Sequence, residues 1–332
     1  GYGVAGDMSR VKHPICEATS ESLFGALTAE EFYAKHGVSH STEYITNSRG
    51  IRLFTQSWRP AASHPPPIAF VAVIHGYTAE SSWLVQLTSV LIASSGFIVS
   101  AIDHQGHGFS DGLLYHIPDI SAVVDDCIHY FSSFRASHAP DLPSFIYSES
   151  LGGAIALFIS LREKGKWNGV VLNGAMCGIS RKFKPPWPLE RLLSLAARFI
   201  PTWRVIPTRG NIPEVSFKVE WKRKLAVASP RRIITRPRAS TALELVRTCE
   251  ELQGRFEDID VPLLIVHGED DVVCDPECVT ALHSRAISGD KTLKIYPAMW
   301  HQLVGEPDDS VDLVFGDVIS WLKTRAEKYL SV

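Results

Sequence analysis

The sequence lacks the features that mark membrane-spanning and secreted chains. Its 332 residues contain no apolar stretch of 18, the length that a helix needs to cross a bilayer. There is no N-x-S/T sequon, and the few cysteines are scattered (Cys16, Cys127, Cys177, Cys249, Cys274 and Cys278). Residues 1–7 have no charged segment followed by an apolar one, and we expect them to be an expression remnant. Free thiols in a reducing compartment are the simplest interpretation, so we predict a cytoplasmic protein.

Patterns of metal ligands are also sparse. Cys274 and Cys278 are four residues apart with His267 nearby, but no second pair with ligand spacing occurs. Another set of candidate ligands lies in a glycine-rich loop (Asp103, His104, His107 and Asp111). We interpret its histidines, and His75, as structural residues beside a site. We therefore predict neither a metal ion nor a cofactor.

A turn of small residues carries a serine between a predicted strand and a predicted helix. The segment Ser148-Glu149-Ser150-Leu151-Gly152-Gly153 follows the apolar run 145–147 and precedes the apolar-rich segment 154–161. It matches the nucleophile-elbow pattern G-x-S-x-G, except that Ser148 replaces the first glycine. Such a turn exposes the hydroxyl of Ser150 and directs the backbone amide of Leu151 toward an oxyanion. We predict these two roles.

Three further segments place polar groups after buried strands. Residues 68–74 are apolar and end in His75-Gly76-Tyr77, so their loop would supply the amide of Tyr77 as a second oxyanion donor. The apolar run 262–266 and the predicted strand 292–296 lead into loops that carry Asp271 and His301. Sites of open α/β sheets lie at the carboxyl ends of the strands. The chain order Ser, Asp, His is the order found in α/β-hydrolases.

The acid has competitors in the same loop. Asp270 competes with Asp271, and Asp275 does so more weakly. We favour Asp271 by its position relative to the strand end. In this arrangement His301 would take the proton of Ser150 during attack and return it to the leaving alcohol, while the acid orients the imidazole.

Together these segments resemble the monoacylglycerol lipases, particularly the plant branch that includes caffeoylshikimate esterases. The resemblance covers residues 46–58, the loops at 75–77 and 103–112, the turn at Ser150 and the two C-terminal loops. It implies that Ser150, Asp271 and His301 are catalytic and that Tyr77 and Leu151 form the oxyanion hole. The family usually has glycine at the position of Ser148 and often methionine at that of Leu151.

Apolar runs alternate with helical patterns, which predicts an α/β-hydrolase fold with a mostly parallel central sheet, helices on both faces and an antiparallel pair at the N-terminal edge. The strands are expected at 43–46, 52–58, 68–74, 97–102, 144–147, 169–172, 262–266 and 292–296, and the helices at 82–94, 120–137, 151–164, 276–287 and 310–329. From 172 to 262 this alternation fails, although 189–200 and 239–253 have helical patterns. We predict a mainly helical cap at 175–245, inserted into a core of residues 1–174 and 246–332.

The predicted cap is strongly basic. It contains fifteen Lys and Arg residues against four Glu, a net charge of +11, whereas the whole chain is −3 and the remainder is therefore −14. Aromatic residues lie among these charges (Phe183, Trp187, Phe199 and Trp203). One hypothesis is that the cap contacts an anionic membrane or attracts an anionic substrate. The alternative is a solvated set of helices that pairs with the acidic core. No nucleic-acid recognition motif is present, so nucleic acid is not an expected partner.

These features predict a serine esterase or lipase that hydrolyses a small-molecule carboxylic ester through an acyl-enzyme. The resemblance implies monoacylglycerol or a phenolic ester such as caffeoylshikimate as substrate. One alternative is an acyltransferase that uses the same acyl-enzyme. Another is a catalytically silent ligand-binding protein, in which Ser148 distorts the turn. Nothing in the sequence predicts an oligomeric state.

Overall fold

Eight strands form one central sheet in the computed structural model, which describes residues 11–180, 191–204 and 212–332. They are β1 (Val38–Thr46), β2 (Arg52–Pro60), β3 (Ala69–Ile74), β4 (Phe97–Ile102), β5 (Ser144–Glu149), β6 (Gly169–Asn173), β7 (Leu263–Gly268) and β8 (Lys291–Tyr296). Their order across the sheet is β1-β2-β4-β3-β5-β6-β7-β8. The strands from β4 to β8 in this order run parallel to one another. β2 pairs antiparallel with β4, and β1 pairs antiparallel with β2. The predicted sheet, with its antiparallel N-terminal edge, is confirmed.

The burial of each strand follows from its place in the sheet. Every residue of β3, β4, β5, β6 and β7 is buried, because helices cover both faces of this parallel region. The edge strand β1 is mostly exposed and polar. Because few of its residues are apolar, the prediction placed its start at residue 43, whereas the strand begins five residues earlier.

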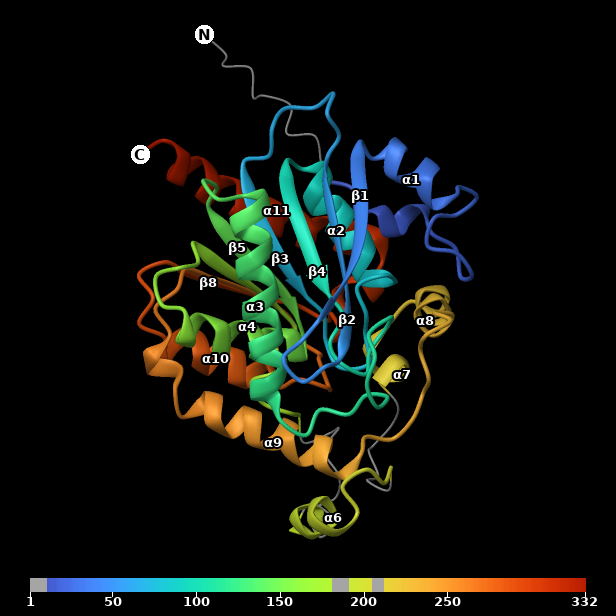
Figure 1. Cartoon of the computed structure of the whole chain (residues 1–332), viewed down its shortest axis with the longest axis vertical. Helices are drawn as coiled ribbons and strands as arrows, with labels where there is room; N and C mark the ends of the chain where they lie inside the picture. Colours follow the sequence, from blue (N-terminus) through green and yellow to red (C-terminus); the bar gives the residue numbers. More distant parts are fainter. Residues whose placement is uncertain (1–10, 181–190, 205–211) are drawn as a thin grey trace.

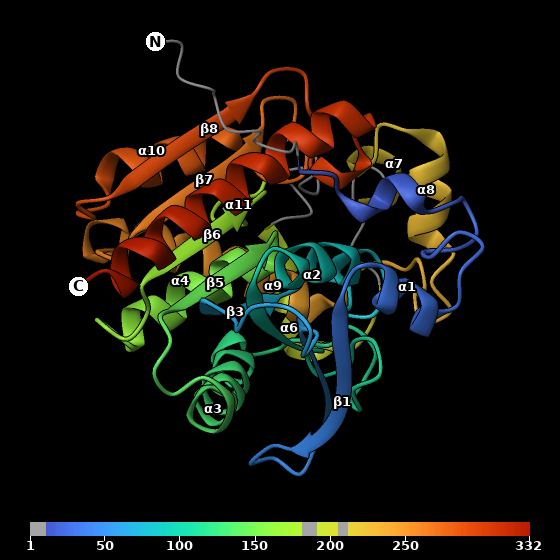
Figure 2. The same ribbon diagram turned by 90° about the horizontal axis from the view of Figure 1, so that it is seen from above.

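The core helices lie on both faces of the sheet (Figure 2). They are α1 (Ala29–Lys35), α2 (Leu84–Ser94), α3 (Ile120–His138), α4 (Leu151–Arg162), α10 (Pro276–Arg285) and α11 (Asp308–Leu330), with short 3₁₀ helices at Pro14–Glu17, Phe256–Asp258 and Leu303–Gly305. Helices α1, α2 and α11 contribute to one apolar cluster, and α3, α4 and α10 contribute to the other. The five helices predicted for the core begin and end within two residues of expectation.

Between β6 and β7 the described residues include four further α-helices: α6 (Leu193–Phe199), α7 (Ile212–Ser216), α8 (Glu220–Val227) and α9 (Ala239–Gln253). Figure 1 shows α6 and α9 at one end of the molecule, away from the C-terminus. The helix predicted at 239–253 is confirmed as α9, whereas α7 and α8 were not predicted. The predicted cap boundary at residue 245 falls inside α9. Parts of the predicted cap, 181–190 and 205–211, lie outside the described residues, as do residues 1–7.

Two glycines bring the start of α4 against the sheet. A Cβ atom at Gly152 would lie 2.2 Å from the carbonyl oxygen of Ile74 at the end of β3, and one at Gly153 would lie 2.7 Å from the Cβ of Ala175. Neither space admits a side chain, so glycine is required for this approach. The close contact fixes the residue before α4 above the carboxyl edge of the sheet.

No helix in the described part of the chain combines the length and the apolar character that crossing a membrane requires.

Candidate active site

Ser150 occupies the turn between β5 and α4 in a strained backbone conformation. Its φ of 51° and ψ of −117° lie in a region that residues other than glycine rarely adopt. Its N–H donates to the carbonyl of Asn173 at 3.0 Å, and its own carbonyl accepts from Gly153 and Met176, each at 2.9 Å. These bonds hold the turn that the sequence predicted.

Ser148 is accommodated within β5 without disturbing this turn. The side chain is fully buried, and its hydroxyl donates to the carbonyl oxygen of Val171 in β6 at 2.8 Å. The residue keeps its register in the sheet, opposite Ile74 on one side and Leu172 on the other. The replacement of glycine by serine is therefore compatible with the positive φ of Ser150.

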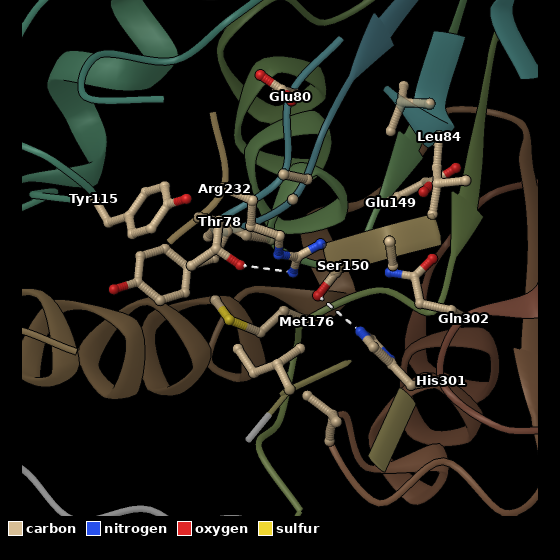
Figure 3. Close-up of a pocket in the computed structure, with 18 of the residues that line it drawn as sticks. Thr78, Glu80, Leu84, Tyr115, Glu149, Ser150, Met176, Arg232, His301 and Gln302 are labelled. Carbon is tan, nitrogen blue, oxygen red and sulfur yellow. Dashed lines mark hydrogen bonds between the residues drawn. The ribbon is translucent and has the colours of Figure 1, made fainter. Parts of the chain in front are cut away.

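Ser150, His301 and Asp271 lie in one hydrogen-bonded series. The Oγ of Ser150 is 3.2 Å from Nε2 of His301, and Nδ1 of His301 is 2.7 Å from Oδ2 of Asp271. Figure 3 shows the imidazole directed at the serine hydroxyl. An Nδ1–H that donates to the carboxylate leaves Nε2 free to accept the serine proton.

The carboxylate of Asp271 is buried but well supported. Its Oδ1 accepts from the amides of Val273 at 2.8 Å and Cys274 at 2.9 Å, while Nε2 of His267 lies 3.1 Å from Oδ2. Burial opposes ionisation, but the contacts with His301 and His267 outweigh it and hold the pKa of Asp271 below its usual range. The carboxyl group is consequently charged at neutral pH.

The two competing acids lie elsewhere. Asp270 is exposed. Asp275 caps the N-terminus of α10, where its Oδ1 accepts from the amide of Glu277 at 2.9 Å. Of the three aspartates, only Asp271 contacts His301 within the described part of the chain.

The predicted oxyanion donors flank the serine. Within the described residues, neither the amide of Tyr77 nor that of Leu151 donates a hydrogen bond to a protein acceptor. A Cβ atom at Gly76 would lie 3.0 Å from the Cβ of Ser150, so the backbone before Tyr77 packs directly against the turn. Two adjacent unpaired amides are suited to an anionic oxygen.

His75 and the histidines of the glycine-rich loop bond to backbone, in keeping with their structural interpretation. His104 donates from Nε2 to the carbonyl of His75 at 2.9 Å, and His107 donates from Nδ1 to the carbonyl of Gln105 at 2.9 Å. His75 donates from Nδ1 to the carbonyl of Gly76 at 2.7 Å, and its Nε2 accepts from the amide of His104 at 3.0 Å. Burial lowers the pKa of His104 to about 4 and that of His107 to about 3, so both rings are neutral. The carboxylate of Asp103 accepts from two backbone amides. No group of three or more potential metal ligands was found among the described residues.

Sequence reasoning missed three groups beside the serine. His267 and Cys274 were considered only as metal ligands, although His267 contacts Asp271. The Sγ of Cys274 lies 3.8 Å from Oγ of Ser150, and burial raises the pKa of this thiol well above its usual range. Glu149 accepts from the hydroxyl of Tyr147 at 2.5 Å, and burial raises its pKa. Of the three, only Glu149 lies within a recognised sequence pattern, at the variable position before the serine of the elbow.

A pocket opens over these residues and encloses about 1130 Å³, including space open to solvent. Part of its lining is apolar (Leu84, Val85, Met176, Ile179, Phe217 and Leu245), and other lining residues are polar or charged (Thr78, Glu80, Tyr115, Ser229, Arg231 and Arg232). Ser150 and His301 also line it. The pocket thus combines an apolar surface with a polar one.

The basic residues of the predicted cap have two kinds of surroundings. Lys218 forms an ion pair of 2.6 Å with Glu306, and Lys222 forms one of 2.8 Å with Asp308, both acids of the predicted core. These pairs agree with the hypothesis of a cap that pairs with the acidic core. Arg232 instead lines the pocket.

Comparisons with known proteins identify related chains. The family model described as Serine aminopeptidase, S33 matches residues 65–308. The caffeoylshikimate esterase of Arabidopsis thaliana is 31% identical over 93% of this chain and 92% of its own length. The human monoglyceride lipase is 27% identical over 85% of this chain and 90% of its own.

A solved structure has the same fold. A soluble variant of the Saccharomyces cerevisiae monoglyceride lipase, in complex with a substrate analog, superposes with a TM-score of 0.74. The match has 20% sequence identity and covers 85% of this chain and 94% of the yeast chain. The predicted α/β-hydrolase fold is confirmed by this match.

Proposed function

Because the chain belongs to the α/β-hydrolase family described as Serine aminopeptidase, S33, and its named relatives are an esterase and a lipase, we propose that it hydrolyses a carboxylic ester through an acyl-enzyme on Ser150. The observation that carries this proposal is the hydrogen-bonded series from Ser150 through His301 to Asp271, with distances of 3.2 and 2.7 Å. Carboxylic ester hydrolase is also the enzyme class of its named relatives.

In the first half of the reaction, the Oγ of Ser150 attacks the ester carbonyl carbon while its proton passes to Nε2 of His301. Asp271 stabilises the imidazolium that forms. The carbonyl oxygen becomes an oxyanion, which accepts hydrogen bonds from the amides of Tyr77 and Leu151. Collapse of this intermediate breaks the bond to the alcohol, which leaves with the proton from His301, and the acyl group stays on the serine.

In the second half, water takes the place of the alcohol. His301 accepts a proton from the water as its oxygen attacks the acyl carbon, and the same amides stabilise the second oxyanion. Collapse releases the carboxylic acid, and the proton returns to Ser150. An alcohol acceptor in place of water would give acyl transfer, and product analysis with added acceptor alcohol distinguishes the two reactions.

The pocket supports an ester with an apolar or aromatic acyl group. Its apolar lining includes Met176, Phe217 and Leu245, which suits a fatty acyl chain or an aromatic ring. Monoacylglycerols and phenolic esters are therefore the substrates that we propose. Initial rates with esters of graded acyl length, measured beside a caffeoyl ester, test this choice: a preference confined to polar acyl groups would contradict it.

A fluorophosphonate probe tests the proposed chemistry directly. We expect covalent labelling of the wild-type protein and of Cys274→Ala, the control at the neighbouring thiol, but none of Ser150→Ala. Ester hydrolysis should be lost with the labelling. Folded wild-type protein that neither labels nor hydrolyses any ester would instead be a silent ligand-binding protein.

We further propose that the described part of the cap contacts anionic membranes from the cytoplasmic side. Four large apolar side chains in and around α6 are exposed (Leu192, Leu195, Phe199 and Trp203), and Arg198 lies on the same helix. Cys16, Cys127, Cys177 and Cys274 are not in disulfides, which supports a reducing compartment. Flotation with phosphatidylserine vesicles tests the contact, which Phe199→Ser with Trp203→Ser should weaken. Equal flotation of both proteins would contradict it.

A further inference from the structure

The pocket contains a cation that ester hydrolysis alone does not explain. Arg232 lies between α8 and α9, and its side chain extends into the pocket that Ser150 lines (Figure 3). Its Nη2 donates to Oγ1 of Thr78 at 3.1 Å. Within the described part of the chain, no carboxylate oxygen lies within 4.0 Å of this guanidinium.

A single hydroxyl leaves most of the donors of this group available. A guanidinium carries five N–H donors in a fixed plane and does not lose its charge in proteins. Burial lowers the pKa of Arg232, which is the direction expected for a cation removed from water. Arg232 is partly buried and is attracted by Glu80 without contacting it, so an anion that enters the pocket gains a direct, charge-assisted interaction with the unused donors.

Glu80 also lines the pocket, but it does not act as the direct partner. Its Oε1 accepts the hydroxyl hydrogen of Ser229, and its Oε2 is buried without a hydrogen-bond partner in the described structure. Burial raises the pKa of Glu80, which disfavours its charged form. The positive charge of Arg232 is therefore not neutralised by a carboxylate in contact with it.

Other arginines reinforce the positive charge at this end of the pocket. Burial raises the pKa of Tyr115, while the positive charges of Arg232 and Arg204 oppose that rise. The guanidinium of Arg231, which also lines the pocket, lies 4.2 Å from the ring centre of Phe109 rather than beside an acid. Arg231 is exposed and Arg204 does not line the pocket, so these charges act at its margin, where a positive potential attracts anions toward Arg232.

We propose that Arg232 forms an anion-binding subsite, which favours, over neutral esters such as monoacylglycerols, an ester that carries a carboxylate or another compact anionic group to pair with its guanidinium. The inference rests on the proposed ester hydrolysis and specifies its substrate class. Thr78 follows Tyr77 directly, so an anion held by Arg232 lies next to the oxyanion-hole segment. This contact would orient the ester over Ser150, with two parallel hydrogen bonds available to a carboxylate.

Matched pairs of esters test the subsite. The first pair is 3-butyryloxybenzoate and its methyl ester, of which only the former carries a negative charge on the alcohol side. The second pair is mono-(4-nitrophenyl) glutarate and 4-nitrophenyl butyrate, of which only the former carries a negative charge on the acyl side. We expect a lower KM for the anionic member of at least one pair. Arg232→Gln, which keeps an N–H for Thr78, should raise that KM roughly tenfold or more and change kcat/KM for the neutral member little.

Two variants control for charge and position. Arg232→Lys keeps the positive charge and should retain part of the preference. Arg236→Gln removes one charge from an exposed position of the same segment and should leave the preference intact. An equal loss on neutral and anionic esters in Arg232→Gln would refute the subsite, since the arginine would then support the turn or the oxyanion instead.

Binding without turnover separates this inference from the proposed chemistry. In Ser150→Ala protein, calorimetry should give tighter binding of the anionic ester than of its neutral partner, and adding Arg232→Gln should remove the difference. Equal affinities would overturn the anion subsite even if the wild-type enzyme hydrolyses both esters. Conversely, an affinity difference in a protein that hydrolyses neither ester would support the subsite and contradict the proposed function. Melting curves of each variant confirm folding.

Discussion

Nδ1 of His301 lies 2.7 Å from Oδ2 of Asp271, and both side chains are almost fully buried. The contact joins the loops that follow β8 and β7, which are neighbouring parallel strands. Neither residue belongs to the predicted cap, but cap residues bond to the loop that carries His301. The amide of Gln302 donates to the carbonyl of Ser216 at 3.1 Å, and Lys218 donates to the carbonyl of Ala298.

This pairing predicts a large difference between adjacent aspartates. Asp271→Asn should lower kcat by about 10⁴, because an amide cannot stabilise the imidazolium or select the same tautomer. Asp270→Asn is the matched control, since its side chain is exposed, and should change kcat by less than about threefold. Steady-state kinetics on one neutral ester measures both. Equal small losses would remove Asp271 from the mechanism.

A second histidine should contribute through the same carboxylate. His267→Ala removes the imidazole whose Nε2 lies 3.1 Å both from Oδ2 of Asp271 and from the carbonyl oxygen of Cys274, and loss of this polar support to Asp271 corresponds to roughly a tenfold fall in kcat. KM should not change, because His267 does not line the pocket. His267→Gln, which can restore an N–H donor, should recover part of the rate. A variant with lower stability but normal kcat would indicate a purely structural role.

Ser148 should matter for stability and little for chemistry. Ser148→Ala loses the hydrogen bond to Val171, and Ser148→Gly also adds backbone freedom in a strand, so we expect losses of about 1 and about 2 kcal/mol in the free energy of unfolding. Both should keep kcat/KM within about threefold. Urea unfolding and ester kinetics measure the two effects. A large fall in kcat/KM in Ser148→Gly would mean that the hydroxyl has a catalytic part.

Acid should destabilise the fold from below about pH 6.5. Burial lowers the pKa of His13 to about 3, alongside the lowered values of His104 and His107, so these rings stay neutral in the folded state while they bind protons when unfolded. Their contribution to stability is complete above pH 6.5 and declines as pH falls toward the folded-state values, by up to about 1.4 kcal/mol per pH unit and ring. Asp103, whose pKa burial raises to about 6, has the opposite sign, as do Glu80, Asp126, Glu149 and Glu244, whose pKa burial also raises. His40, His75 and His116, whose pKa burial lowers, add to the loss of stability in acid.

Urea midpoints measured from neutral pH down to about pH 4.5 test this expectation, since the unfolded-state histidine pKa of about 6.5 lies inside that interval and the folded-state values lie below it. His107→Gln should flatten the dependence, whereas His64→Gln, at an exposed position, is the control and should not. A urea midpoint that does not change with pH would contradict the prediction that the buried histidine rings stay neutral in the folded protein.

Sequence patterns predicted the parts of the fold that depend on local composition. The apolar run at 68–74 became β3, and the turn at Ser150 took its strained conformation, because both signals lie within a few consecutive residues. The order of β3 and β4 in the sheet could not be predicted, since alternation of strands and helices does not specify which strands pair. The short helices α7 and α8 were missed because their few residues give little periodic signal.

The site was predictable only where it follows strand ends. Ser150, Asp271 and His301 each stand a few residues after a strand, so the topology of parallel strands brings them to one edge. The contact of His267 with Asp271 depends on the path of the turn between them, and that of Arg232 with Thr78 joins residues 154 positions apart. Neither contact leaves a pattern in the sequence.

Helix α9 connects the pocket to the apolar core. Leu245 in its middle lines the pocket, and both Leu245 and Leu252 near its end pack into the apolar cluster to which α3, α4 and α10 contribute. The continuous helix therefore holds a wall of the pocket on the same core that supports the sheet. A packing defect at Leu252 would accordingly change the space above Ser150, although Leu252 does not line that space.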